Sequence, residues 1–332
     1  MKNFNVVKNK KIAFLIVAVV LVAGIASFLI QGFNIDIDFS GGTEIQVNLG
    51  REVTPEICDE INDIIESHEL LGKIYVSSTT QSGADANTAI IRTGSKELTN
   101  EQQDALIQSL EAKYDFNREE TELQITSVSP SIGSSLKKTA VLSIVIAAVL
   151  MLVYISFRFQ VASGVAAVLC LVHDLFVMLA VYSLFQIPIN ANIIAAFLTI
   201  LGYSINATIV VFDRVRENKK RASDDVGFGD IVDDSVRQTL ARSVNTTLTT
   251  LFTIGMIYIF GVESIRNFAL PLIIGIVAGL FSSVCLSGPL WVLLDGAFGR
   301  KKDKDGKKDK KDKDKDKKPK AGKKEKKGGE KA

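Results

Sequence analysis

Six long apolar runs determine what this chain can fold into, because about 20 apolar residues suffice to cross the roughly 30 Å of hydrocarbon in a bilayer. The predicted spans are 12–30, 139–157, 161–185, 189–212, 246–260 and 268–294. Hydrophobic residues make up 47% of the 332 residues, and they are gathered into these runs rather than spread with amphipathic spacing. We therefore expect a polytopic α-helical membrane protein with six transmembrane helices.

Orientation follows from the basic residues in the short flanks of these runs, because loops rich in Lys and Arg remain in the cytoplasm. The basic flanks precede the first span, separate the second from the third and follow the fourth: Lys2, Lys8, Lys10, Lys11, Arg158, Arg214, Arg216, Lys219, Lys220 and Arg221. Both termini, 1–11 and 300–332, should therefore be cytoplasmic. The first run is long enough to remain as an uncleaved anchor rather than a secretory signal.

The external segment, residues 31–137, carries its own pattern of strands and helices. Strands are predicted at 43–49, 73–78, 88–93 and 122–128, with helices at 55–68 and 100–114. This βαββαβ order predicts one extracytoplasmic ferredoxin-like α+β domain, with a four-stranded antiparallel sheet and two helices on one face. The segment holds 19 acidic and 7 basic residues, a balance that excludes a nucleic-acid surface there.

Candidate catalytic and metal-binding residues are few. Cys58 is external and Cys170 and Cys285 lie in separate spans, so the sequence predicts neither a disulfide framework nor a metal motif. His68 is the single histidine outside the spans, without a second histidine or a cysteine nearby. We expect no cofactor, no metal and no enzymatic activity, and the external domain is interpreted as a binding or coupling module.

Two cytoplasmic segments complete the chain. The segment 213–245 has apolar residues at 231, 232, 236 and 240 on one helical face, which predicts an amphipathic surface helix leading into the fifth span. The tail 300–332 holds 18 basic and 8 acidic residues in a Lys- and Asp-rich sequence, and we expect it to be disordered. The tail is either a solvated tether or a contact for anionic membrane lipids or ribosomal RNA; nucleic acid is not required for the function proposed below.

Polar residues inside the spans are the candidate functional residues, because such groups are costly in lipid and face the interior of a bundle. Asp174, with its neighbour His173, lies about 12 residues into its span, which at about 1.5 Å per residue is near the midplane. It is either a hydrogen-bonded structural partner or a carrier of protons. Arg242 and Asn245 make the start of the fifth span unusually polar.

The fourth span concentrates several of these groups on one face. Asn206 and Asp213 are two helical turns apart and share that face with Tyr203 and Val210, while Gly202 would let another helix approach. Asn206 should face neighbouring helices or a hydrated path rather than acyl chains. Asp213 lies at the lipid boundary, where a solvated charge is an equally good explanation.

Several short motifs resemble those of the SecF proteins of the SecD/SecF family, which belongs to the resistance-nodulation-division superfamily. The matching stretches are 38–43, 129–133, 172–174, 201–206, 211–217 and 242–250, and their family-motif residues include Asp38, Gly41, Gly42, Pro130, Gly133 and Gly202. The similarity extends from the first span to about residue 294 and leaves the tail out.

The resemblance implies a location in the bacterial cytoplasmic membrane and a set of partners. SecD would supply six further helices, and the pair would bind the SecYEG channel. The external domains would then act on a translocating preprotein after the ATPase SecA has pushed it, driven by the proton motive force. The same resemblance implies a transport auxiliary rather than a catalyst.

One residue departs from the family pattern. The family usually has an aspartate directly after the amide of the fourth span, where this chain has Ala207. That aspartate is associated with proton conduction, together with the arginine matching Arg242 and a SecD carboxylate. Either Asp174 or the SecD carboxylate carries the proton here, or the chain couples to Na⁺ or only weakly; an engineered replacement of the aspartate would give the same sequence.

Two other classes of protein remain open from the sequence. A structural or assembly subunit of the translocon with little ion coupling is favoured by Ala207. A small-molecule or lipid exporter of the same superfamily would use a similar bundle, but a single external domain of about 100 residues is small for a substrate pocket.

Overall fold

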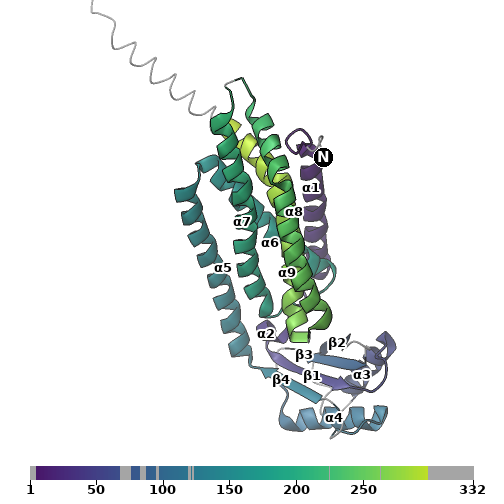
Figure 1. Cartoon of the computed structure of the whole chain (residues 1–332). Coiled ribbons are helices and arrows are strands. Elements are labelled where there is room, and N and C mark those ends of the chain that lie inside the picture. Colours follow the sequence, from purple (N-terminus) through teal and green to yellow (C-terminus); the bar gives the residue numbers. More distant parts are fainter. Residues whose placement is uncertain are drawn as a thin grey trace, which may run out of the picture.

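The structure is a computed structural model that describes residues 5–67, 76–82, 87–94, 97–118, 121, 123–223, 225–261 and 263–297. His68, the first residues of the strand predicted at 73–78 and the whole tail 300–332 lie outside the described residues. Figure 1 shows a helical bundle with a small α/β unit at one end.

The bundle is built from six helices that are long and apolar enough to cross a membrane within the described part of the chain. They are α1 (Lys10–Gln31), α5 (Pro130–Arg158), α6 (Val161–Leu184), α7 (Asn192–Arg221), α8 (Phe228–Phe260) and α9 (Glu263–Phe281), which continues into the π-helix η1 (Ser282–Leu286). Helix α5 stands at one edge of the bundle (Figure 1). The chain is thus a polytopic helical membrane protein.

Helices α7 and α8 extend well beyond the spans predicted at 189–212 and 246–260. Most of the segment 213–245, predicted to be a separate surface helix, belongs to these two helices, and only a short connection around 222–227 joins them. Asn218 on α7 donates a hydrogen bond to Ser235 on α8 at 2.8 Å, and Val232 and Val236 are buried. The amphipathic face therefore packs inside a helical hairpin.

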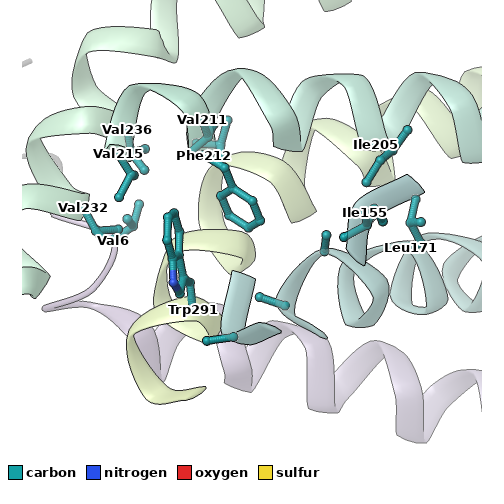
Figure 2. Packing of buried hydrophobic residues seen from close by; sticks show 14 of the residues in the cluster. Val6, Ile155, Leu171, Ile205, Val211, Phe212, Val215, Val232, Val236 and Trp291 are labelled. Atoms are coloured by element: carbon teal, nitrogen blue, oxygen red, sulfur yellow. The ribbon is translucent and has the colours of Figure 1, made fainter. Parts of the chain in front are cut away.

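The core at this end of the bundle is aromatic. The ring of Trp291 lies edge-on against two phenylalanine rings. The ring centroids are 4.8 Å apart for Phe212 and 5.5 Å apart for Phe228. Figure 2 shows Trp291 between residues of α7 and α8, with Val6 from the N-terminal segment close by. The start of the chain is thereby held against the α7–α8 hairpin, and the Val7 amide donates to Asp233 Oδ1 at 2.8 Å.

The α/β unit has four strands, β1 (Gly42–Asn48), β2 (Val76–Ser82), β3 (Thr88–Thr93) and β4 (Leu123–Val128). Their order is β2-β3-β1-β4, and every pair is antiparallel. Helices α3 (Pro55–Ser67) and α4 (Asn100–Tyr114) cover one face. The buried residues beneath them are apolar and include Ile45, Val47, Ile61, Ile65, Ile91, Leu106 and Leu110.

The opposite face of the sheet is polar and turned toward the bundle (Figure 1). A cavity of about 400 Å³ lies between them, lined from the sheet by Glu44, Gln46, Arg92, Gln124 and Thr126 and from the bundle by Asn190, Asn192 and Asn267. The short helix α2 (Ile37–Ser40) lies at this junction. The two halves of the molecule therefore meet through polar groups.

Candidate functional site: a buried carboxylate and an exposed polar stripe

A buried carboxylate lies in the middle of the bundle. The side chain of Asp174, on α6, is 1% exposed. Its Oδ2 accepts hydrogen bonds from Ser204 on α7 and from Ser282 at 2.8 Å, and its Oδ1 lies 3.0 Å from His173 Nδ1. Three helical segments thus converge on one carboxyl group.

Glycines on α9 allow this convergence. A Cβ on Gly279 would lie 3.3 Å from the Cβ of Ser204, and one on Gly275 would lie 2.5 Å from Ile200 Cγ1. Small residues four apart let two helices approach closely in a membrane. Ser282 follows at the start of η1, where an irregular helix presents its hydroxyl to Asp174.

The arrangement can hold either a negative charge or a proton. Both serine hydroxyls act as donors to Asp174, which suits an ionised carboxylate, and His173 can supply the compensating charge when it is protonated. His173 also lines an apolar cavity of about 240 Å³ between α1, α6 and the helical residues Leu286 and Leu290 that follow α9.

Asp213 belongs to a different environment. Both of its carboxylate oxygens accept hydrogen bonds from Arg158 Nη2, at 3.0 and 3.1 Å, and Arg216 lies 3.5 Å away. The Asp213 side chain is 43% exposed, so the pair contributes at most about 1 kcal/mol. It ties the end of α5 to α7, and the structure does not bring it to Asp174.

The remaining predicted residues lie on the outside of the bundle. Gly202, Asn206, Arg242 and Asn245 are all exposed, and a Cβ on Gly202 would meet no atom within 4 Å. Ala207 is half-buried beside them. We call Gly202, Asn206, Arg242 and Asn245 the polar stripe. Within this chain, Asn206 therefore faces outward and does not contact the buried carboxylate.

The family-motif residues near the external domain come together at the junction. Gly41 has φ 75° and a Cβ there would lie 2.7 Å from the Pro130 Cα. A Cβ on Gly133 would lie 3.0 Å from the Phe39 carbonyl oxygen. The segment after α1 is thus pressed against the start of α5, and glycine is required where the backbones meet.

A buried ion-pair cluster fixes this segment to the sheet. Arg92 Nε lies 2.7 Å from Glu44 Oε2 and 3.8 Å from Asp36 Oδ1. Burial raises the pKa of the Asp36 carboxyl from 3.8 to about 6; the nearby Arg92 lowers it, while the charges of Glu44 and Asp38 raise it. Asp36 therefore has a pKa of about 6 in the folded chain.

This raised pKa predicts a pH dependence of stability. A carboxyl whose pKa is higher when folded stabilises the folded state below about pH 4, and that contribution is lost as the pH rises through about 6. The chain should therefore unfold at a lower temperature at pH 7 than at pH 5, by a few degrees. Asp36→Asn should reduce this difference, as measured by thermal unfolding in detergent, whereas exposed Asp104→Asn should not.

The acidic, histidine and cysteine side chains are not grouped as metal ligands in the described part of the chain. The described residues hold no group of three or more His, Cys, Asp and Glu side chains placed to bind a metal ion. Cys58, Cys170 and Cys285 are free thiols. Ser204 and Ser282, which bind the Asp174 carboxylate, were not predicted from the sequence.

Comparisons with known proteins agree with the motifs. The family described as "Protein export membrane protein SecD/SecF, C-terminal" matches residues 108–297. "Protein translocase subunit SecF" of Acidaminococcus fermentans is 37% identical over 92% of this chain and 100% of that protein. The SecF of Alicyclobacillus acidocaldarius is 35% identical over 87% of this chain and 92% of its own.

A solved structure supports the same relationship. The crystal structure of SecDF, a translocon-associated membrane protein from Thermus thermophilus, is 30% identical with a TM-score of 0.71 over 86% of this chain. This chain spans 38% of that SecDF chain. On sequence and structure together, the chain belongs to the SecD/SecF protein-export family, within its SecF branch.

Proposed function

We propose that this chain is the SecF subunit of a SecD–SecF pair in the bacterial cytoplasmic membrane. The pair assists SecYEG- and SecA-dependent translocation of preproteins by using the proton or sodium motive force. The observation that carries the proposal is the polar stripe, because the Asn206 amide lies within the fourth span and is exposed on this chain, and an amide at membrane depth requires a protein partner.

SecD is the partner that fits the polar stripe. Gly202 leaves room for close approach of another helix, while Asn206 and Arg242 offer hydrogen bonds to it. Tyr203 donates a hydrogen bond to Thr250 Oγ1 at 3.4 Å, which links α7 to α8 beside the stripe. The solved relative is described as SecDF and is much longer than this chain, which is consistent with a second half that covers this face.

A photo-crosslinking experiment tests the pairing. A photoreactive residue at Asn206 should form an adduct with co-expressed SecD, whereas one at Val172, which is 58% exposed on α6, should not. The readout is a band shift detected with antibodies to both proteins. Equal labelling from both positions, or failure to co-purify with SecD, would contradict the proposal.

Two further properties belong to the same proposal. The strand order β2-β3-β1-β4 with two helices on one face supports a ferredoxin-like external domain. The basic end of α7, with Lys219, Lys220 and Arg221, lies at the end of the bundle away from the sheet and supports a cytoplasmic position for both termini. We assign no enzymatic activity to the chain.

Ion coupling is the part of the proposal on which Ala207 bears. We expect Ala207→Asp to increase export that depends on the motive force, because it adds a titratable group beside Asn206 and near the stripe that SecD would cover. Export into inverted membrane vesicles, with and without an ionophore, measures this. Ala207→Asn introduces a side chain of similar shape to aspartate that cannot carry a proton, and it should not increase export. If Ala207→Asp also left motive-force-dependent export unchanged, this expectation would be contradicted.

A structural subunit with little ion coupling is the second candidate, and Ala207 is the observation that favours it. Such a subunit would still bind SecD through the polar stripe. It would differ in the behaviour of Asp174, whose buried hydrogen bonds would then serve only to join α6, α7 and η1. Neutralising Asp174 therefore separates the two candidates.

A further inference from the structure

Two segments far apart in the sequence form a short strap between the external domain and the bundle. The Asp36 amide donates to the Ile189 carbonyl at 3.2 Å, and the Ile189 amide donates to the Asn34 carbonyl at 2.8 Å. Ile35 and Ile189 thereby form an isolated parallel bridge. We call the paired segments 34–38 and 189–191 the strap.

The strap ends on the first turn of α7. This helix begins at Asn192, and its N-cap is Ala191, whose side chain offers no acceptor. The carboxylate of Asp38 accepts the Ala191 amide at 2.8 Å. The next amide, that of Asn192, donates to Asn190 Oδ1 at 3.2 Å. The first amides of a helix lack partners within it and carry partial positive charge, so a carboxylate from another segment adds to the stabilisation of this end.

The other end of the strap is fixed to the external domain. Asp38 lies in α2, and the preceding Asp36 lies beside the buried Arg92–Glu44 pair of the sheet. Directly after α2, Gly41 is pressed against Pro130 and Gly42 begins β1. Movement of Asp38 would therefore require movement of the sheet.

Helix α7 also carries the groups of the candidate site. Ser204 binds the Asp174 carboxylate, and Asn206 belongs to the polar stripe. Ser204 follows the start of the helix by 12 residues, roughly 18 Å along a rigid rod. A displacement of α7 at the site is thus transmitted to Asp38 without an intervening flexible segment.

We propose that Asp38 is a positioning residue that couples α7 to the external domain by capping that helix from a separate segment. The inference rests on the proposed function, since it assumes that α7 moves when an ion passes. It assigns the coupling to the hydrogen bond between Asp38 and the Ala191 amide rather than to chain connectivity alone, and to hydrogen-bond acceptance rather than to negative charge.

Two substitutions at one position test this assignment in the full SecD–SecF complex. Asparagine caps helices about as well as aspartate, whereas alanine does not. Asp38→Ala should therefore lose motive-force-dependent export and exchange the Ala191 amide about fivefold faster in hydrogen-exchange mass spectrometry, while Asp38→Asn keeps both properties. SecD should co-purify with every variant.

A disulfide cross-link between the two segments of the strap gives a second test. Ile35→Cys with Ile189→Cys, in a chain whose native cysteines are replaced, should form a disulfide that joins the two segments. Export with the motive force should survive oxidation, because the strap moves as one piece. Loss of export on oxidation, restored by reduction, would show that the strap has to open and would overturn the inference.

The outcomes are distinguishable. The inference is overturned if Asp38→Ala behaves as the unmodified chain, if Asp38→Asn fails together with Asp38→Ala, or if Asp38→Ala releases SecD. If the unmodified complex itself gains nothing from the motive force, the proposed function and the coupling role both fail, and the exchange rate of the Ala191 amide still decides whether Asp38 caps α7.

Discussion

Replacing Asp174 with asparagine should reduce the motive-force-dependent part of export to the level left by an ionophore, while the chain still assembles with SecD. Asparagine has nearly the same shape and its oxygen can still accept from Ser204 and Ser282, but it cannot carry the proton that the proposed function assigns to this carboxyl group. The measurement is preprotein import into inverted vesicles in parallel with co-purification. This is the largest functional effect that we expect from one substitution.

Asp234→Asn is the matched control for that experiment. Asp234 loses the same charge, but its side chain is 58% exposed on α8 and pairs with Arg237 at the surface. Export should therefore be unchanged. If Asp174→Asn also left motive-force-dependent export intact, the carboxylate would be only a structural partner of α7 and η1. The structural subunit with little ion coupling would then be the better of the two candidate functions.

Gly41→Ala should strongly destabilise the junction between the external domain and the bundle. The backbone of Gly41, at φ 75° and ψ 166°, lies in a region that only glycine adopts readily and that costs alanine about 1–3 kcal/mol. Overpacking adds about 1–3 kcal/mol, giving roughly 2–6 kcal/mol in all. The added Cβ would lie 2.7 Å from the Pro130 Cα and 2.8 Å from its nitrogen, both backbone atoms that cannot rotate away. Unfolding in detergent, followed by circular dichroism, measures the loss.

Gly50→Ala separates the cost of the backbone conformation from the cost of the steric contact with Pro130. Gly50 has φ 65°, close to that of Gly41, but a Cβ there would meet no atom within 4 Å. It should lose only the roughly 1 kcal/mol that comes from the backbone conformation. Equal losses at the two positions would mean that contact with Pro130 contributes nothing.

The general architecture was predictable because span length and strand alternation are local properties of the sequence. Six apolar runs gave six helices, and the turn residues between 43 and 128 gave the order of strands and helices. A helix leading into the fifth span was predicted, as in α8, but the extension of α7 and the packing of α8 against it were not. They depend on contacts between the two helices, such as Asn218 with Ser235, that no single window of sequence contains.

The candidate site was predictable only in part, for two physical reasons. A serine in a helix commonly bonds to its own backbone, so nothing local distinguished Ser204 and Ser282 from the others. Asn206 was expected to face neighbouring helices or a hydrated path, and within this chain it is exposed, so any helix that covers it belongs to another chain. Asp38 and Ala191 are 153 residues apart, and their hydrogen bond follows from the tertiary fold alone.

The π-helix at Ser282–Leu286 has a consequence for how this part of the sequence can change in evolution. A wider turn accommodates one more residue than an α-helix, so each residue after it is rotated by about 100° relative to an uninterrupted helix. Deleting one residue there would restore regular hydrogen bonding but turn Trp291 away from Phe212 and Phe228. Single-residue gaps should therefore be rejected in this stretch.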